Sequence, residues 1–269
     1  MIAPTADLAE FAAPKRDRWG RPLITPPEGG KPVAYTRVST LAKTLDDQSG
    51  LMLWKQRQTI LGVAKRADLY TLAKSANGDK QTLNDVAKQA MDAADSSAAA
   101  NTGTALHSFT EAIDLGHDID APSEYAADLA AYANATKPLT VVLAERFCVN
   151  DVLQTAGSFD RLVRLPNGQT CIADLKTGKD APRYAHSTAA QVATYANSLL
   201  YDPLTGARTE LPGPLNLDIG LLIHLPIGAG ECTIYKLDLA FGFQWAQVAT
   251  EVRAWRKAKP ATLAWSATA

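Results

Sequence analysis

Residues 156–178 read AGSFDRLVRLPNGQTCIADLKTG, and this stretch decides the fold. Two runs rich in apolar and β-branched residues flank the turn signal Pro-Asn-Gly, which predicts a β-hairpin. Asp160 lies on the first arm of the hairpin, and Asp174 and Lys176 lie on the second. Because side chains alternate along a strand, Asp174 and Lys176 share one face, and pairing of the arms brings Asp160 near Asp174.

Two carboxylates held this close repel each other unless a cation lies between them or one of them is protonated. Mg²⁺ is commonly bound by one or two carboxylates together with waters and substrate phosphates. A lysine two residues beyond such a ligand can balance the charge of an attacked phosphate, which indicates hydrolysis of a phosphodiester. The alternative is an exposed ion pair between Asp174 and Lys176, and the D-x-K spacing alone favours this alternative.

The rest of the chain predicts an α/β fold. Apolar residues at helical spacing predict a mostly helical region from about residue 36 to residue 136, including a helix that Thr102 or Thr104 caps and Gly116 ends. From about residue 102 the expected order of elements is α-α-β-β-β-α-β-β-α. The strands are expected at 139–149, 155–165, 169–177, 215–225 and 231–239, and the later helices at 182–201 and 241–259.

One structural domain overall is expected, in three parts. Residues 1–35 are rich in proline and predict an extended N-terminal arm that is partly ordered at best. Residues 36–100 form a helical extension, and residues 101–269 form the core with its C-terminal helix. No apolar run has the length of a signal peptide or a membrane span.

Composition limits the classes of function. The net charge is −1, so binding to a polyanion must come from a local patch. The three cysteines, Cys148, Cys171 and Cys232, are far apart and form no CxxC motif, which argues against a structural zinc site or a four-cysteine iron–sulfur cluster. Such cysteine usage fits a reducing cytoplasm. A P-loop would need glycine where Ala173 stands, so no nucleotide cofactor is expected.

Four short motifs occur in order around the hairpin: GTALHSFTEAI, GSFD, DLKTGK and QVATYA. Together they resemble the RecB-like branch of the PD-(D/E)XK nuclease superfamily over about residues 100–200. The matching positions are Gly103, His107, Glu111, Gly157, Asp160, Asp174, Lys176, Thr177, Gly178, Gln191 and Tyr195. The resemblance implies a core with a mixed central sheet flanked by helices, in the order α-β-β-β-α-β.

The resemblance also assigns roles to these residues. It implies that His107, Asp160 and Asp174 bind the metal, helped by the backbone carbonyl of Leu175. The catalytic set would be Lys176, Asp174, Asp160 and Glu111, with Glu111 orienting the histidine or reaching a second ion through water. Gln191, Tyr195 and Thr177 would support the site or contact the DNA backbone. The implied cofactor is one or two Mg²⁺ or Mn²⁺ ions.

Other interpretations remain open for single residues. His107 could be a capped or core histidine, and Glu111 could lie on a solvated helix face. Gln191 and Tyr195 could form a polar stripe along their helix.

As a whole, the resemblance implies a metal-dependent DNA exonuclease, encoded by a phage or prophage and acting in recombination, repair or replication in the cytoplasm of a bacterial host. The alternatives are a structure-specific endonuclease and a catalytically silent, nuclease-like DNA-binding scaffold. The expected partners are linear double- or single-stranded DNA and a recombination or annealing protein. Strand polarity, oligomeric state and selectivity between DNA and RNA do not follow from the sequence.

Three basic segments with a tryptophan are candidate DNA contacts, because phosphate contact and base stacking suit this combination. They are KRDRWGR at 15–21, RAWRKAK at 253–259, and the run Lys55, Arg57, Lys65 and Arg66 beside Trp54, which we expect to line a channel for a DNA end. The alternative for each is a solvated charged face, with a core tryptophan in the third.

Overall fold

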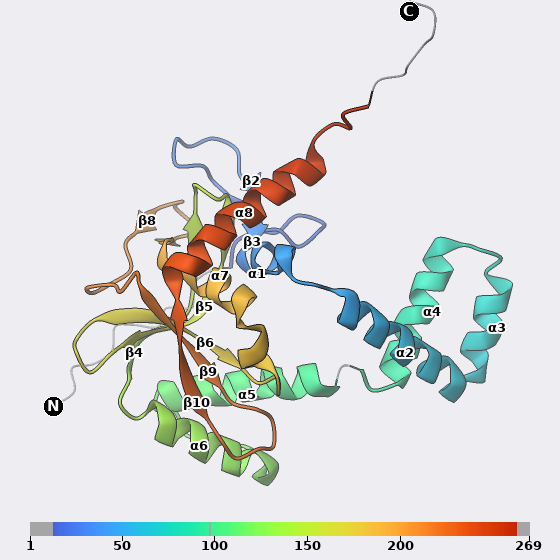
Figure 1. Cartoon of the computed structure of the whole chain (residues 1–269), viewed down its shortest axis with the longest axis horizontal. Coiled ribbons are helices and arrows are strands. Elements are labelled where there is room, and N and C mark those ends of the chain that lie inside the picture. Colours follow the sequence, from blue (N-terminus) through green and yellow to red (C-terminus); the bar gives the residue numbers. More distant parts are fainter. Residues whose placement is uncertain (1–12, 97, 263–269) are drawn as a thin grey trace, which may run out of the picture.

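A mixed central sheet of eight strands forms the middle of the molecule, and helices cover both of its faces (Figure 1). The computed structural model describes residues 13–96 and 98–262. The expected α/β class, with a mixed sheet flanked by helices, is therefore confirmed. Within these residues no helix is both long enough and apolar enough to cross a membrane.

The strand order of the sheet is β10-β9-β6-β5-β4-β7-β8, and β3 pairs with β5. Two pairings are parallel, β6 with β9 and β3 with β5, and the others are antiparallel. The strands are β3 (Thr36–Arg37), β4 (Thr140–Asn150), β5 (Thr155–Arg164), β6 (Thr170–Lys176), β7 (Leu199–Tyr201), β8 (Arg208–Thr209), β9 (Ile219–His224) and β10 (Thr233–Asp238). The predicted hairpin is β5–β6, and Gly168 in its turn has the positive φ of 85° that this turn requires.

Two pairs of helices enclose the sheet. Helices α7 (Ala185–Ala196) and α8 (Leu239–Lys257) pack on one face, together with α1 (Val38–Ala42), and α5 (Ala98–Asp114) and α6 (Ala126–Thr136) pack on the other. The crossing of α7 and α8 is close, since a Cβ atom added to Gly242 would lie 2.3 Å from the carbonyl oxygen of Ala189. Only glycine allows the two backbones to approach this far.

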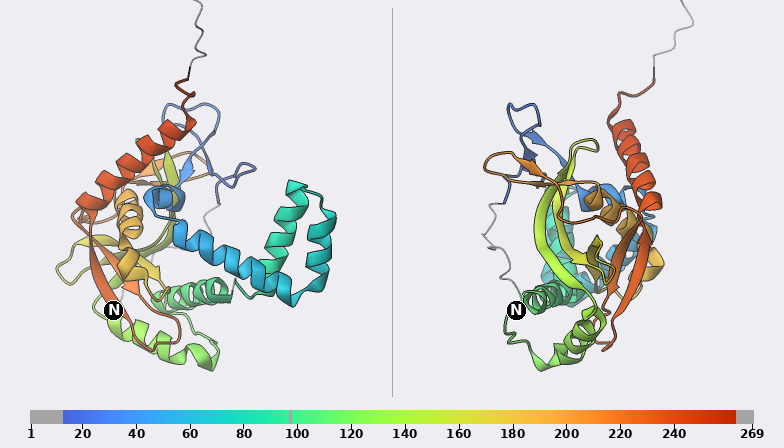
Figure 2. Two further views of the ribbon diagram at one scale, coloured as in Figure 1. Left: turned by 45° about the vertical axis from the view of Figure 1, so that its right-hand side comes forward. Right: turned by 90° about the vertical axis from the view of Figure 1, so that its left-hand side faces the viewer.

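A small helical arm projects from this body (Figure 2). It consists of α2 (Ser49–Lys65), α3 (Ala67–Ser75) and α4 (Lys80–Ala93), which pack around Leu69, Val86 and Ala90. Residues 36–45, the beginning of the predicted helical extension, instead form β3, α1 and the 3-10 turn η1 (Lys43–Leu45), and α1 packs against α7 and α8. The projecting part of the chain therefore begins at Ser49.

Several predicted element boundaries were wrong. Helix α5 begins at Ala98, so Thr102 and Thr104 lie inside the helix and do not cap it, whereas Gly116 does follow its end with a φ of 70°. The predicted helix at 182–201 ends at Ala196, and β7 follows because it completes the sheet beside β4. Part of the predicted N-terminal arm, residues 1–12, lies outside the described residues; the rest contains a short ribbon of β1 (Leu23–Ile24) and β2 (Val33–Ala34).

A buried polar network joins α5 and α6 to β5. Arg161, which is 2% exposed, forms an ion pair with Asp114 and donates a hydrogen bond of 2.8 Å to the hydroxyl of Thr110. The hydroxyl of Tyr132 on α6 donates to the same Asp114 carboxylate at 2.8 and 2.9 Å, and burial raises the pKa of this tyrosine above its usual value. Every charge in this network therefore has a partner, as a charge in a sheet interior requires.

We predict that Arg161→Met lowers the free energy of unfolding by about 3–5 kcal/mol, because it leaves the buried Asp114 carboxylate without its counter-ion. Urea denaturation followed by circular dichroism measures the change. Arg66→Gln is the matched control, since it removes the exposed ion pair with Asp68, which solvent screens, and should leave stability nearly unchanged. Equal effects of the two substitutions would contradict the role assigned to the network.

Candidate active site

Three acids lie in a row across three neighbouring strands. The pairs Ala144↔Arg161 and Arg146↔Phe159 place Glu145 of β4 opposite Asp160 of β5. Arg161 of β5 pairs with Ala173 of β6, which is the last pair of this antiparallel ladder. The next residue on each strand places Asp160 opposite Asp174. The structure thus brings Asp160 and Asp174 together, as the sequence predicts, and adds a third carboxylate beside them.

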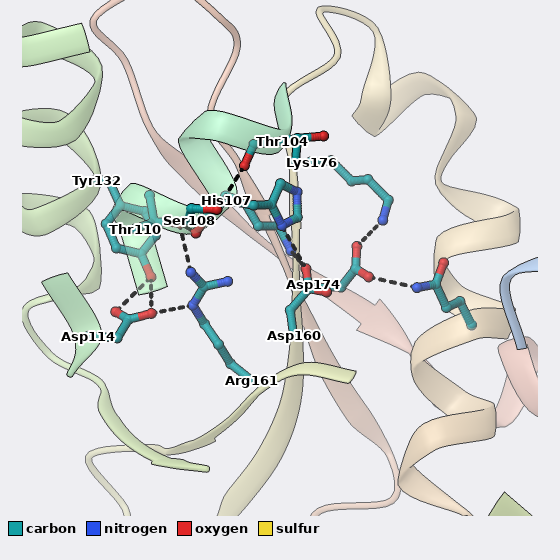
Figure 3. Close-up of polar contacts among 12 residues, drawn as sticks. Thr104, His107, Ser108, Thr110, Asp114, Tyr132, Asp160, Arg161, Asp174 and Lys176 are labelled. Atoms are coloured by element: carbon teal, nitrogen blue, oxygen red, sulfur yellow. Dashed lines mark hydrogen bonds and ion pairs between the residues drawn. The ribbon is translucent and has the colours of Figure 1, made fainter. Parts of the chain in front are cut away.

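Asp174 is buried and held from two sides (Figure 3). Its Oδ1 accepts a hydrogen bond of 2.9 Å from the side-chain amide of Gln191 on α7, and its Oδ2 contacts the ammonium group of Lys176. Burial raises the pKa of Asp174 to about 6, although the nearby ammonium acts in the opposite direction. Because Asp174 is only 1% exposed, the alternative of an exposed surface ion pair does not hold.

Lys176 keeps its charge in this setting. Burial alone would lower the pKa of its ammonium group, but Asp174 and Asp160 outweigh burial and hold the pKa above its usual value. The site therefore presents a fixed positive charge beside two carboxylates at neutral pH.

Asp160 connects the strands to α5. Its Oδ2 accepts a hydrogen bond of 2.8 Å from the backbone N–H of Leu175 and lies 3.6 Å from Nδ1 of His107. Burial, and then the charge of Lys176, lower the pKa of His107, so the imidazole is neutral at pH 7. A neutral imidazole offers a nitrogen lone pair to a ligand.

Glycine is required at two of the motif positions, Gly103 and Gly157, for steric reasons. A Cβ atom on Gly103 would lie 2.7 Å from the side-chain oxygen of Thr177, so this glycine lets α5 approach the turn that follows β6. A Cβ atom on Gly157 would lie 2.9 Å from the hydroxyl of Tyr195, so this glycine makes room for the α7 tyrosine. Neither steric requirement can be predicted from the sequence alone, because each depends on a contact with a distant part of the chain.

The turn after Lys176 is anchored by β9. Nε2 of His224 is 2.9 Å from the carbonyl oxygen of Gly178, and the backbone N–H of Leu225 donates to the carbonyl of Lys176 at 2.9 Å. His224 is a residue that sequence reasoning missed, because its contact depends on the parallel pairing of β6 with β9.

The remaining predicted residues take different positions. Tyr195 is buried with its ring against Phe159, at a centroid distance of 6.2 Å, which suits a supporting role better than contact with a ligand. Glu111 lies on α5 near Glu145, and its carboxylate forms neither a hydrogen bond nor an ion pair with a described residue. Lys65 and Arg66 of the arm are held by Asp95 and Asp68, which leaves Lys55 and Arg57 for the expected channel.

Glu145 is the second residue that sequence reasoning missed. It has a φ of 48°, which departs from the extended backbone of its strand. Its side chain reaches solvent, yet the surrounding protein, and then the charges of Asp160 and Glu111, raise its pKa to about 7. The available signal was a single acid in a largely apolar strand beside the hairpin.

Comparisons with protein-family models and with curated proteins find no match to this chain. The chemistry of the cluster therefore has to be inferred from its own residues. These are an acidic row, one fixed ammonium, one neutral imidazole and one amide that holds the central carboxylate.

We predict that Gly103→Ala fails to stabilise the protein, although alanine is the better helix former, because the new methyl group meets Thr177. Gly50→Ala on α2, where nothing lies within 4 Å of the added atom, should be neutral or stabilising by at most about 1 kcal/mol. Thermal unfolding measures both changes. Adding Thr177→Ala to Gly103→Ala should recover stability, and the absence of any recovery would show that the contact does not limit the position of α5.

Proposed function

We propose that this chain is a metal-dependent DNA exonuclease built on a PD-(D/E)XK core. The observation that carries the proposal is the cluster at the end of the β5–β6 hairpin, where Asp160, Asp174 and Lys176 meet. Each of the three occupies its own motif position. Asp160 contacts His107 from α5, Asp174 accepts a hydrogen bond from Gln191 on α7, and Lys176 pairs with Asp174 within β6. An arrangement of this kind is typical of phosphodiester hydrolysis, and it supports the proposal more strongly than any single motif.

The donor atoms fit a hard divalent cation. Asp160 and Asp174 supply carboxylate oxygens and His107 supplies a neutral imidazole, a set that Mg²⁺ tolerates and Mn²⁺ accepts more readily. Oδ2 of Asp174 is fully buried and lacks a hydrogen bond of ordinary geometry from the described residues, so only the ammonium of Lys176 neutralises it. Within the described residues no three such side chains already form a closed metal cage, and Asp174 would have to share its oxygen between Lys176 and the ion.

The ion would supply charge stabilisation at the attacked phosphate. The side chains of the site would position the reacting groups and supply further charge. Lys176 places a permanent positive charge where negative charge develops on the phosphate, and Asp174 aims this ammonium. Gln191 keeps the Asp174 carboxylate from rotating, and the Leu175 N–H does the same for Asp160. Glu145, whose pKa is raised to about 7, is an acid of this row that can accept and release a proton near neutral pH.

Two other functions use the same cluster. A structure-specific endonuclease would need the same ligands, and a silent scaffold would keep the fold without turnover. The exonuclease is favoured because the arm α2–α4 projects beside the body, where it can restrict access to a strand end (Figure 2). Within the arm, Lys55 and Arg57 are exposed and are the residues left to line such a path.

We predict that Lys176→Ala reduces DNase turnover by about 100-fold or more while the binding of DNA and metal largely survives, because the lysine acts as a positioned charge. Asp174→Ala should instead weaken metal binding, measured by isothermal titration with Mn²⁺. Lys179→Ala is the matched control, since Lys179 is an exposed lysine three residues further along the chain. Wild-type turnover in both Lys176→Ala and Asp174→Ala, or full activity in chelator, would favour the scaffold.

Access to DNA ends provides a second test. We predict that the protein with Mg²⁺ degrades linear DNA progressively and leaves a covalently closed circle intact, as followed by gel electrophoresis. The Lys176→Ala protein, purified in parallel, controls for contaminating nuclease. Nicking of supercoiled circles at a comparable rate would contradict the exonuclease assignment and support an endonuclease. The proposed metal site would be unaffected, because the same ligands serve both reactions.

A further inference from the structure

Three adjoining cavities follow the segment α1–η1. One of about 390 Å³ lies beside the start of β5, one of about 420 Å³ lies between η1 and the end of α8, and one of about 370 Å³ lies between η1, α7 and α8. The first two share Arg37 and Ser39, and the last two share Asp46. Each cavity therefore shares lining residues with the next one along α1–η1, and we refer to the three together as the groove.

The first two cavities are strongly basic. They are lined by the cations Arg16, Arg37, Lys43, Arg253 and Arg256 and by the single acid Asp46. None of these five cations forms an ion pair with another described residue; Arg16 and Arg256 donate only to backbone carbonyls. Because the whole chain carries a net charge of −1, this is a local concentration of positive charge without counter-ions.

The crowding of these cations is itself unfavourable. Arg253 is half-buried, and burial followed by the charges of Arg256 and Arg21 lowers its pKa. A polyanion in the groove would relieve this repulsion and release its own counter-ions. The segments at 15–21 and 253–259, far apart in the sequence, thus contribute to one surface.

The third cavity is aromatic. Phe241 and Trp245 meet edge to face with ring centroids 5.9 Å apart, and His186 lies 5.3 Å from Phe241. Trp245 remains 40% exposed, so a flat ring can reach its surface. Every nucleobase can stack on such rings, but a base within a duplex is already stacked and paired and cannot enter.

Helix α7 contributes residues both to the groove and to the catalytic cluster. Ser187, Gln191 and Tyr195 succeed one another at intervals of four residues and lie on one face of this helix. Ser187 lines the aromatic cavity, Tyr195 lines the first basic cavity, and Gln191 between them holds Asp174. Each interval is about one helical turn, about 5.4 Å, so Gln191 and its contact with Asp174 lie about one turn from each of these two cavities.

We propose that this groove binds a single-stranded segment of the substrate, with its phosphate backbone on the five cations and an unpaired base in the aromatic cavity. The inference rests on the proposed function, which identifies the nucleic acid as DNA. It adds that the bound DNA is single-stranded. The substrate is a single strand, or the single-stranded overhang of a duplex, in preference to a blunt duplex.

Fluorescence anisotropy in chelator tests the base contact, because no cleavage occurs. The probes are a labelled single strand, an abasic strand of the same length and a blunt duplex. The wild-type protein should bind the single strand about tenfold more tightly than the abasic strand. Trp245→Leu should abolish this difference and Trp245→Phe should retain it. Trp255→Leu is the matched control, since Trp255 lies on the same helix, is 76% exposed and lines none of the three cavities.

The salt dependence of binding tests the phosphate contacts. The double variant Arg37→Gln, Arg253→Gln should reduce the slope of log affinity against log salt by about 1.4, or about 0.7 for each cation removed. Lys236→Gln, on the exposed strand β10, should leave the slope unchanged.

Equal wild-type affinity for the single and abasic strands, or equal effects of Trp245→Leu and Trp255→Leu, would overturn the inference. These outcomes are independent of the proposed reaction. If the protein shows the base preference but no DNase activity with Mg²⁺, the binding groove is supported and the proposed nuclease function is contradicted. If the protein is a nuclease but its Trp245→Leu variant still prefers the single strand to the abasic strand, the nuclease function is supported and the binding groove is contradicted.

Discussion

The buried ion pair between Arg161 and Asp114 determines where the site can form. Arg161 directly follows Asp160 on β5, and Asp114 lies two helical turns after His107 on the same face of α5. Fixing this one contact therefore fixes the helix against the strand, and the distance between His107 and Asp160 follows from it. A charge pair with no part in the proposed chemistry thus helps to position the residues to which that chemistry is assigned.

The sheet concentrates negative charge that the fold has to balance. The row of Glu145, Asp160 and Asp174 follows from strand register alone, and like charges on adjacent strands destabilise a sheet unless they are compensated. Lys176 provides one compensating charge. Burial first, and then the neighbouring carboxylates, raise the pKa of Glu145 and of Asp174. A bound cation would add to the compensation, so stability and ligand affinity are linked at this site.

The sequence was sufficient for features that depend on short-range patterns. Alternation and the Pro-Asn-Gly turn predicted the β5–β6 hairpin and the meeting of Asp160 with Asp174, because antiparallel register is fixed by the turn. It was insufficient wherever the reason lies in a distant element. Glu145 joins the row only through the register of β4, and His224 supports the turn only through a parallel pairing. The basic groove likewise gathers charges from both ends of the chain, and no local window contains them.

The pairing of β3 with β5 has a consequence for the order in which the protein folds. Thr36 pairs with Thr155, and Tyr35 donates a hydrogen bond to Asp151, which in turn binds Arg208. At about 5–20 residues per second, the ribosome needs on the order of ten seconds to complete these partners. The segment from Arg16 to Arg37 therefore leaves the ribosome well before its partners do, and during that interval its arginines are available to any polyanion near the ribosome.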